Sequence, residues 1–243
     1  MIACDAAENL SHEIAAWAMS ENVKDTAVDK LLKLLKPHHP DLPVTSKTLK
    51  NTGYQAADIV NIAGGEYVHL CILNGMKRLD NEILALDVID YHINVDSLPL
   101  FRSSGKQLWP ILGKTVGLRC PFVIGVFCGP NKPSNVNKFL HCFLEEATVL
   151  KTSGFTLQGI AFRAHPVCFI CDAPASALLK QTKSQTGYYG CDRCAEKGEC
   201  IQARLTFPQL TADIRTDDLF ANVKYEDHQM GRSPLTDPGF GMI

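Results

Sequence analysis

The spacing of hydrophobic positions changes along the chain, from a helical period in residues 1–80 to a strand-like pattern after residue 83. In the first part, apolar side chains recur every three or four residues, which places them on one face of a helix. The residues that define two such faces are Leu10, Ile14 and Trp17, followed by Val28, Leu31, Leu32 and Leu35. The first part is therefore predicted to be helical.

The second of these helices is expected to end before Pro37, because a residue that precedes proline is biased away from the helical conformation. A further helix is predicted after the Gly64-Gly65 pair, with an apolar face of Tyr67, Leu70 and Leu73. We interpret residues 1–80 as a helical leader that forms a small bundle or clamp. A separate DNA-binding domain is the less favoured interpretation, because these helices lack a basic stripe.

Three strand-like segments follow the leader. Residues 83–101 are rich in β-branched side chains, residues 108–117 form a second apolar segment, and residues 121–129 form a third that a Gly-Pro pair closes. Each segment has the length and the flanking turn residues of a strand.

An amphipathic helix is predicted next, between Ser134 as a candidate N-cap and Gly154 as a candidate stop. Its apolar face consists of Phe139, Cys142, Phe143, Ala147 and Leu150. Residues 155–172 are then predicted to be extended, and residues 174–180 to form a short helix.

The resulting order is three strands, a helix and a returning strand, which builds a mixed sheet covered by helices. The ribonuclease-H-like fold begins with the same order. We therefore expect an α/β protein in which the helical segment, residues 1–80, precedes an incomplete ribonuclease-H-like core, residues 83–186. A CxxC zinc-type insertion and the end of the chain occupy residues 187–243.

The composition excludes some classes of protein but does not identify a function. The 243 residues are 46% hydrophobic and 21% charged, as in an ordinary globular protein, and the net charge of −2 argues mildly against a large phosphate-contacting surface. No apolar run approaches the roughly 20 residues that cross a bilayer, and the N-terminus is acidic where a signal peptide is basic. We therefore expect an intracellular protein without a membrane partner, whose ten cysteines are reduced.

Two acids accompany apolar segments. Asp96 lies within the first segment, between Val95 and Ser97-Leu98, and Asp172 directly follows the last one. Asp96, taken alone, is more readily interpreted as a solvated strand carboxylate. Asp172 is equally well interpreted as the N-cap of the helix that starts near Pro174 or as a ligand at the carboxyl edge of the sheet, where open α/β sheets bind ligands.

Taken together, the two acids suggest a metal site. In a ribonuclease-H-like sheet the first and fourth strands are neighbours, so Asp96 and Asp172 are expected to meet. Mg²⁺ or Mn²⁺ would bind there, because these hard ions prefer oxygen ligands and support phosphoryl transfer in pairs. A third carboxylate is normally required. The candidates, none in a context that recommends it, are Glu145, Glu146, Glu226 and Asp227.

Cys191 and Cys194 have the spacing of half a zinc site. Cys200 and His228 are nearby candidates for the missing ligands, and the histidine is the more attractive. Unpaired surface thiols are the next interpretation. A thioredoxin-like redox pair ranks last, because the flanking residues are polar.

Basic residues are more frequent in the middle and at the end of the chain than the net charge suggests. They are Arg102, Lys106, Lys180, Lys183, Arg193, Arg204 and Arg215. Contact with phosphates is one interpretation, but scattered surface charge is the simpler one for each residue taken singly.

Several blocks occur in a characteristic order. They are HINVDSLPLFRSSGKQLWPIL, PFVIGVFCGPNKP, FICDAPASALLK and GYYGCDRC, followed by FPQL, RTDDLF and HQMGRSPL. The leader adds WA, LLKLLKPHHPDLP and GGEYVHLCI. Together these blocks resemble animal transposase-domain proteins derived from CACTA (En/Spm)-type DNA transposons, and the resemblance extends from about residue 10 to the last residue.

The resemblance implies a ribonuclease-H-like nuclease and strand-transferase core that acts on DNA at transposon ends, in the nucleus, and is compatible with a homo-oligomer. By position, Asp96 in NVDSLPLF matches the first catalytic acid and Asp172 in CDAPA the second. The CxxC matches a zinc-type insertion, which implies structural Zn²⁺ at Cys191 and Cys194 with His228 as a candidate ligand.

In the family the chain continues beyond the HxxGxSPL-like block, and the third acid lies in that continuation, whereas this sequence ends at TDPGFGMI. We therefore expect a transposase fragment that is inactive alone, with an ancestral activity of metal-dependent DNA cleavage and strand transfer. The alternative is a transposon-derived, zinc-containing module that binds DNA or a protein without catalysis.

Overall fold

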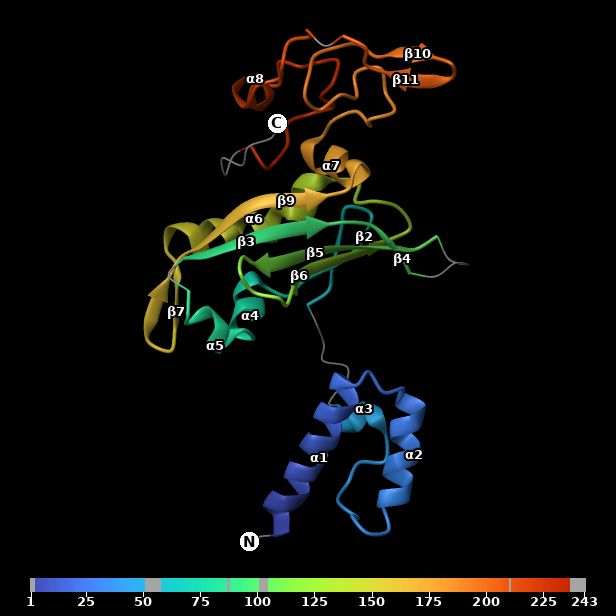
Figure 1. Cartoon of the computed structure of the whole chain (residues 1–243), viewed down its shortest axis with the longest axis vertical. Coiled ribbons are helices and arrows are strands. Elements are labelled where there is room, and N and C mark those ends of the chain that lie inside the picture. The colour runs from blue at the N-terminus through green and yellow to red at the C-terminus, as the bar shows by residue number, and fades with distance from the viewer. Residues whose placement is uncertain (1–2, 51–57, 87, 101–104, 210, 237–243) are drawn as a thin grey trace. The chain divides into compact units, whose positions relative to one another are not determined.

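The computed structural model describes residues 3–50, 58–86, 88–100, 105–209 and 211–236. The chain forms two compact units, Met1–Ala57 and Asp58–Ile243, and each is described by itself (Figure 1). None of the helices within the described ranges is long and apolar enough to cross a membrane.

The first unit is helical, as the period of its sequence predicts. Its helices are α1 (Ala3–Ser20), α2 (Asp25–Leu35) and α3 (Ser46–Leu49). Their buried apolar side chains form a small core of Ala15, Ala18, Val28, Leu32, Leu42 and Leu49. Helix α2 ends before Pro37, as expected, and the Lys36 ammonium donates a hydrogen bond to the Pro40 carbonyl at 2.7 Å. Trp17 stays 45% exposed, so only part of the expected apolar face of α1 is used.

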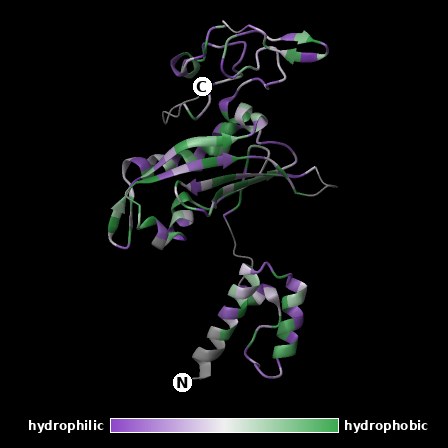
Figure 2. Cartoon of the chain, in the orientation of Figure 1, coloured by the Kyte–Doolittle hydropathy of each residue, from purple (hydrophilic) through white to green (hydrophobic). Residues whose placement is uncertain are grey.

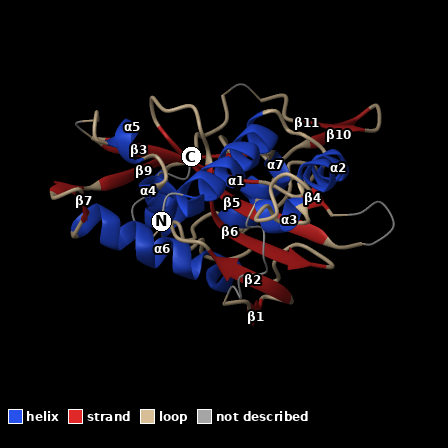
Figure 3. Ribbon diagram, turned by 90° about the horizontal axis from the view of Figure 1, so that it is seen from below, coloured by secondary structure: helices blue, strands red, loops and turns tan. Residues whose placement is uncertain are grey.

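The second unit is built around a mixed sheet, so the chain is an α/β protein. The strands of the sheet are β1 (Val60–Ile62), β2 (Gly65–His69), β3 (Ile89–Val95), β4 (Leu98–Pro99), β5 (Gln107–Thr115), β6 (Phe122–Gly129) and β9 (Ala164–Cys171). Their order is β1-β2-β6-β5-β3-β9, with β4 paired to β5 (Figure 3). Among the described strands only β3 and β9 pair in parallel, and the helix α6 (Val136–Thr152) lies in the long connection that parallel strands require.

The predicted succession of three strands, a helix and a returning strand is confirmed. Strands β3, β5 and β6 fall in the three predicted segments, and β9 falls in residues 155–172. That last segment also contains the hairpin β7 (Phe155–Leu157) and β8 (Ile160–Phe162), where a single extended stretch was expected. The short helix predicted after Asp172 is α7 (Ala173–Lys180).

Helix α6 has a different N-cap from the predicted one. The side chain of Asn135, not that of Ser134, accepts a hydrogen bond from the Lys138 amide at 3.0 Å. Asn135 has the extended backbone of a cap, with a φ of −137°, so its side chain reaches back over the first turn. At the other end Gly154 has a φ of +73°, and a Cβ there would meet the Phe162 carbonyl oxygen, so this stop requires a glycine.

The helix predicted after residue 65 is wrong at its start, because strand β2 occupies that stretch and helix α4 (Ile72–Lys77) begins later. Tyr67 pairs with Phe127 of β6, and Gly125 on β6 leaves the space that the tyrosine ring fills. Sheet pairing thus overrides the local hydrophobic period. As a result β1, β2 and α4, which lie within the predicted leader of residues 1–80, belong to the second unit.

One face of the sheet carries the main core. Every second residue of β3 is fully buried, from Ile89 through Tyr91 and Ile93 to Val95. Helices α4 and α6 pack on the sheet, and the short helix α5 (Asp80–Ile83) packs against α4. In Figure 2 hydrophobic residues gather along the strands. The exposed apolar residues on the strands include Val123, Val167 and Ile170, which are 40%, 51% and 54% exposed.

Residues 181–236 form a loop-rich part whose short elements are β10 (Glu199–Ile201), β11 (Arg204–Thr206) and α8 (Asp217–Ala221). Hydrogen bonds attach this part to α7. The Ser233 hydroxyl donates to the Leu179 carbonyl at 2.7 Å, and the Lys180 ammonium donates to an Asp192 carboxylate oxygen at 3.1 Å.

Candidate functional site

The two predicted acids lie at the carboxyl ends of neighbouring parallel strands. Asp96 directly follows β3, and Asp172 directly follows β9. The last residues of these strands, Val95 and Cys171, are partners in the register of the pair. The two carboxylates therefore leave the sheet from adjacent positions on the edge where open α/β sheets bind ligands.

Each acid also holds the backbone that follows it. One oxygen of Asp172 accepts a hydrogen bond from the Ala175 amide at 2.8 Å, which makes this residue the N-cap of α7. One oxygen of Asp96 accepts a hydrogen bond from the Ser97 amide at 2.6 Å. Within the described residues the second oxygen of each carboxylate accepts no hydrogen bond. Each acid therefore accepts a backbone amide through one oxygen and can bind a cation through the other.

The charges of both acids affect the pKa of the Cys171 thiol. Burial raises the pKa of this thiol, and the negative charges of Asp172 and Asp96 raise it further. Both carboxylates therefore act on the same point at the end of the strand pair. The same two charges would attract a divalent cation.

The four acids considered as a third ligand have other surroundings. Glu145 lies on α6 with its side chain 67% exposed, 3.4 Å from the ring nitrogen of His141. Glu146 is turned toward the start of α4, as described below. Glu226 and Asp227 are exposed in the loop-rich part. The structure thus places Asp96 and Asp172 directly after paired strand ends and, in the ranges it describes, groups no third acid with them.

The predicted cysteine pair is formed. The sulfurs of Cys191 and Cys194 lie 3.2 Å apart, and the Cys194 amide donates to the Cys191 sulfur at 3.4 Å. Burial opposes the ionisation of Cys191, but the amide and thiol of Cys194, the amide of Arg193 and the charge of Arg215 outweigh it and lower the pKa. Zinc ligands at the usual ~2.3 Å bond length lie about 3.8 Å apart in a tetrahedral site, so a small adjustment would admit the ion.

His228 is buried close to this turn, and one of its ring nitrogens has no hydrogen-bond partner among the described residues. Nδ1 lies 2.6 Å from the Tyr189 carbonyl, and since a carbonyl only accepts, Nδ1 carries the proton. Burial lowers the pKa of the ring, which is therefore neutral near pH 7 with a free electron pair on Nε2. This atom has no hydrogen bond and lies 3.6 Å from a carboxylate oxygen of Asp192. A cation between the two atoms would satisfy both.

The structure does not place His228 with the two sulfurs as a third ligand. Within the described ranges, no third histidine, cysteine or carboxylate has a ligand atom within 4.8 Å of both of them. Cys200, the other candidate, is exposed on β10. The half-site expected from the spacing is thus present, and its completion stays a prediction.

Arg215 is only 4% exposed, so it is not available to a phosphate on the surface. Its Nε donates to the Cys191 carbonyl at 3.1 Å, and its guanidinium lies 4.6 Å from the centre of the Tyr225 ring. Lys180 pairs with Asp192 at 3.1 Å. Arg102 lies outside the described residues, and the exposed remainder of the predicted set is Lys106, Lys183, Arg193 and Arg204. Arg215 therefore supports the cysteine turn.

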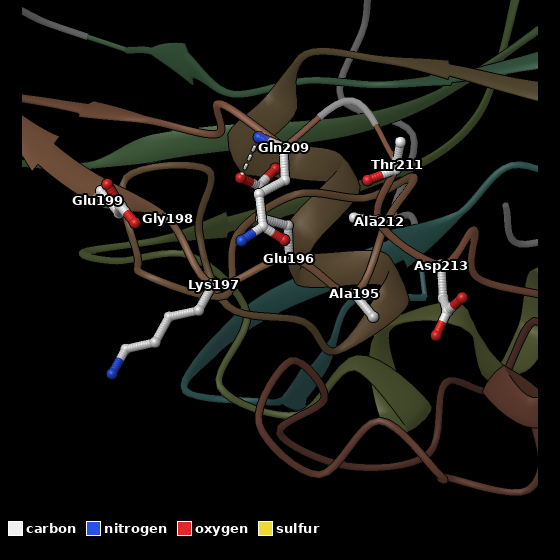
Figure 4. Close-up of a pocket in the computed structure, with 9 residues that line it drawn as sticks. All are labelled: Ala195, Glu196, Lys197, Gly198, Glu199, Gln209, Thr211, Ala212 and Asp213. Atoms are coloured by element: carbon white, nitrogen blue, oxygen red, sulfur yellow. Dashed lines mark hydrogen bonds between the residues drawn. The ribbon is translucent and has the colours of Figure 1, made fainter.

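A depression of about 650 Å³ opens beside the cysteine turn (Figure 4). Its lining residues are Ala195, Glu196, Lys197, Gly198, Glu199, Gln209, Thr211, Ala212 and Asp213. Glu196 is 5% exposed and accepts a hydrogen bond from the Gln209 amide at 2.6 Å, which joins the two loop segments. In Figure 4 the Lys197 side chain extends away from the other lining residues. The depression thus follows from how these two loops are fastened.

A third group of metal-ligand residue types was missed in the sequence. His69, Cys71 and Glu146 each place one ligand atom so that the three atoms lie within 4.8 Å of one another. Their side chains come from β2, from the residue before α4 and from α6, and the glutamate is 75 positions beyond the cysteine. Only the short His-x-Cys spacing could have drawn attention to them.

The fold and these sites define an α/β protein with two acids at one sheet edge and a paired-cysteine turn. Comparison of the sequence with models of known families and with curated proteins finds no match.

Proposed function

We propose that the second unit derives from the core of a cut-and-paste DNA transposase and that Asp96 and Asp172 are metal-binding acids of that core. The observation that carries the proposal is the pairing of Val95 with Cys171, which brings the acids that follow them to one edge. Two-metal phosphoryl transfer needs carboxylates from different elements that converge on Mg²⁺ or Mn²⁺.

The strand order supports the same assignment. Strands β3, β5 and β6 form an antiparallel meander, α6 follows, and β9 returns parallel to β3 on its free side. This is the arrangement expected at the beginning of a ribonuclease-H-like fold, in which the first and fourth strands carry the first two acids. The family resemblance of the sequence blocks then names DNA transposon ends as the substrate and the nucleus as the place of action.

The residues at the edge suit a hard divalent ion. Asp96 and Asp172 are held by backbone amides through one oxygen each, so the other oxygen is oriented before the ion arrives. When bound, such ions would stabilise the charge on the attacking and leaving oxygens of a phosphodiester. Since the described residues supply two carboxylates and the chemistry normally uses three, the expected activity of this chain is ion binding without DNA cleavage.

Calorimetric titration of the full chain with Mn²⁺ tests the proposal. We expect weak binding that becomes at least tenfold weaker in Asp96→Asn and in Asp172→Asn, because each change removes a charge and keeps the shape. Asp90→Asn is the matched control, since Asp90 lies near the other end of β3. Unchanged Mn²⁺ affinity in both edge variants would remove the metal role and with it the main support for the transposase origin.

The second candidate function is a zinc-containing module that binds DNA or a protein without catalysis. Two observations favour it. The Cys194 amide donates to the Cys191 sulfur, and the buried His228 Nε2 has no hydrogen-bond partner within the described part of the chain. A redox role is less well supported, because this CxxC lies in a turn and not at the start of a helix, where thioredoxin-like motifs gain their reactivity.

Zinc content and limited proteolysis separate this module from the first candidate. We expect Cys191→Ser to lose the zinc of the cysteine turn and to expose residues 187–230 to protease, whereas Asp96→Asn should keep that zinc and resist the protease as the wild type does. Cys120→Ser, an exposed cysteine, is the control. Protein purified without chelator that contains no zinc would count against the module.

A further inference from the structure

Three donors of different chemistry meet between β2, α4 and α6. His69 is the last residue of β2, Cys71 directly precedes α4, and Glu146 reaches over from α6. Their nitrogen, sulfur and oxygen atoms lie within 4.8 Å of one another. Imidazole, thiolate and carboxylate are the ligands that Zn²⁺ takes in proteins, so the composition of the group favours a transition metal over Mg²⁺ or Ca²⁺.

The spacing of the donors is close to that of a ligand shell. His69 Nε2 lies 2.9 Å from Glu146 Oε2, at hydrogen-bond distance. Nitrogen and oxygen ligands of tetrahedral zinc lie about 3.3 Å apart at the usual bond lengths, so the pair has to open by roughly half an ångström. The proton that the two atoms now share would leave when the ion enters.

The orientation of each ligand is fixed by a second contact. The Tyr67 hydroxyl lies 3.0 Å from His69 Nδ1, which turns Nε2 toward the glutamate. The amides of Ile72 and Leu73 donate to the Glu146 carboxylate at 2.7 and 3.0 Å. Such outer contacts are what holds ligands in place around a metal.

A structural role alone explains Glu146 but not its neighbours. Its hydrogen bonds anchor the first turn of α4, which accounts for its position without any ion. Cys71, however, has a φ of +69°, which a non-glycine residue rarely adopts, and its side chain makes no capping bond. Tyr91, fully buried on β3, has a hydroxyl without a hydrogen-bond partner among the described residues. A ligand role for the Cys71 sulfur accounts for the unusual backbone of that residue.

We propose that His69, Cys71 and Glu146 form a zinc-binding site that is distinct from the acidic sheet edge and from the cysteine turn. Three protein ligands leave a fourth position for water. The side chains of His69 and Glu146 are each 18% exposed, so an ion reaches them from solvent.

The test is zinc stoichiometry and affinity in the full chain after removal of metal by a chelator. The wild-type chain is expected to bind one zinc at this cluster, and Cys71→Ser is expected to weaken that ion at least tenfold. Cys120→Ser is the matched control, because it removes an exposed thiol and should leave binding unchanged. Cys191→Ser distinguishes the cluster from the cysteine turn, since it should leave the Cys71-dependent ion in place.

Substitution of Co²⁺ for zinc supplies a second measurement. Absorption from thiolate-to-cobalt charge transfer should persist in Cys191→Ser and be lost when Cys71→Ser is added to it. If Cys71→Ser fails to fold, His69→Gln replaces it, because glutamine can still donate to Glu146 while the imidazole ligand is removed. Affinity and absorption in Cys71→Ser or His69→Gln that equal those of Cys120→Ser would overturn the proposal, whatever Cys191→Ser shows.

Discussion

Replacement of Glu146 by alanine should destabilise the second unit strongly, whether or not a metal binds. In the metal-free protein this carboxylate accepts hydrogen bonds from the Ile72 and Leu73 amides and lies 2.9 Å from the His69 ring nitrogen. Alanine would leave both amides at the start of α4 without an acceptor. It would also remove the link between α6 and the end of β2.

The magnitude follows from these contacts. A hydrogen bond to a charged group contributes about 1.5–3 kcal/mol, and the two amides share one carboxylate, so their contributions overlap. The side chain is 18% exposed, which lets water replace only part of what is lost. We therefore expect Glu146→Ala to lower the free energy of unfolding by about 3 kcal/mol.

Urea denaturation in the presence of a chelator measures this loss, with Glu145→Ala as the control. Glu145 is the preceding residue of the same helix, its side chain is 67% exposed, and its ion pair with His141 spans 3.4 Å. Its removal should change stability by less than about 0.5 kcal/mol. Equal midpoints for the two variants would refute the claim that Glu146 anchors α4.

Three further changes test the structure at independent points. The hydrogen bonds to Glu146 outweigh its burial and hold its pKa below the ordinary 4.5. The stabilisation that these bonds give is therefore complete above pH 4.5 and is lost as the pH falls through the pKa of the folded state. The difference in the free energy of unfolding between wild type and Glu146→Gln should accordingly narrow on acidification. In chemical denaturation, Gly154→Ala should lower the free energy of unfolding by about 2 kcal/mol or more, and Gly159→Ala by about 1 kcal/mol. Both glycines have a positive φ, but only at Gly154 would a Cβ meet a backbone carbonyl. Asp172→Ala should lower stability by about 1 kcal/mol while Asp172→Asn stays within a few tenths, since asparagine also caps a helix; equal losses would argue against the cap.

The acidic edge was predictable because each half of it has a local pattern. Asp172 directly follows an apolar segment, Asp96 lies within another, and a ribonuclease-H-like order of strands and helix would place those two segments side by side. The cap role of Asp172 was also foreseen, from the nearby proline and the helix that follows. The sequence pattern did not decide whether Asp172 could cap the helix and bind a metal ion at the same time. In the structure the Ala175 amide occupies one oxygen of Asp172, and within the described residues the second oxygen has no hydrogen bond, so the cap leaves room for a ligand role.

Features that depend on tertiary contacts were beyond the sequence. Tyr67 lies in a stretch with a helical period, yet its pairing with Phe127 makes it a strand residue. The Cys191–Cys194 spacing predicted a close pair but not the direction of His228, which is set by the Tyr189 carbonyl 39 positions earlier. The cluster around Glu146 was missed for the same reason, since nothing in the sequence of α6 indicates that this glutamate turns toward β2.

The acids proposed as ligands share a feature that bears on how their function is tested. Asp96, Asp172 and Glu146 all accept backbone amides, so each is fixed in place before any ion is present. Alanine at any of these positions would disturb the backbone and the site together, and lost metal binding would then have two explanations. Asparagine or glutamine keeps an acceptor oxygen but removes the charge. A variant of this kind that folds normally and no longer binds the ion therefore assigns the carboxylate a role in binding that its structural contacts do not account for.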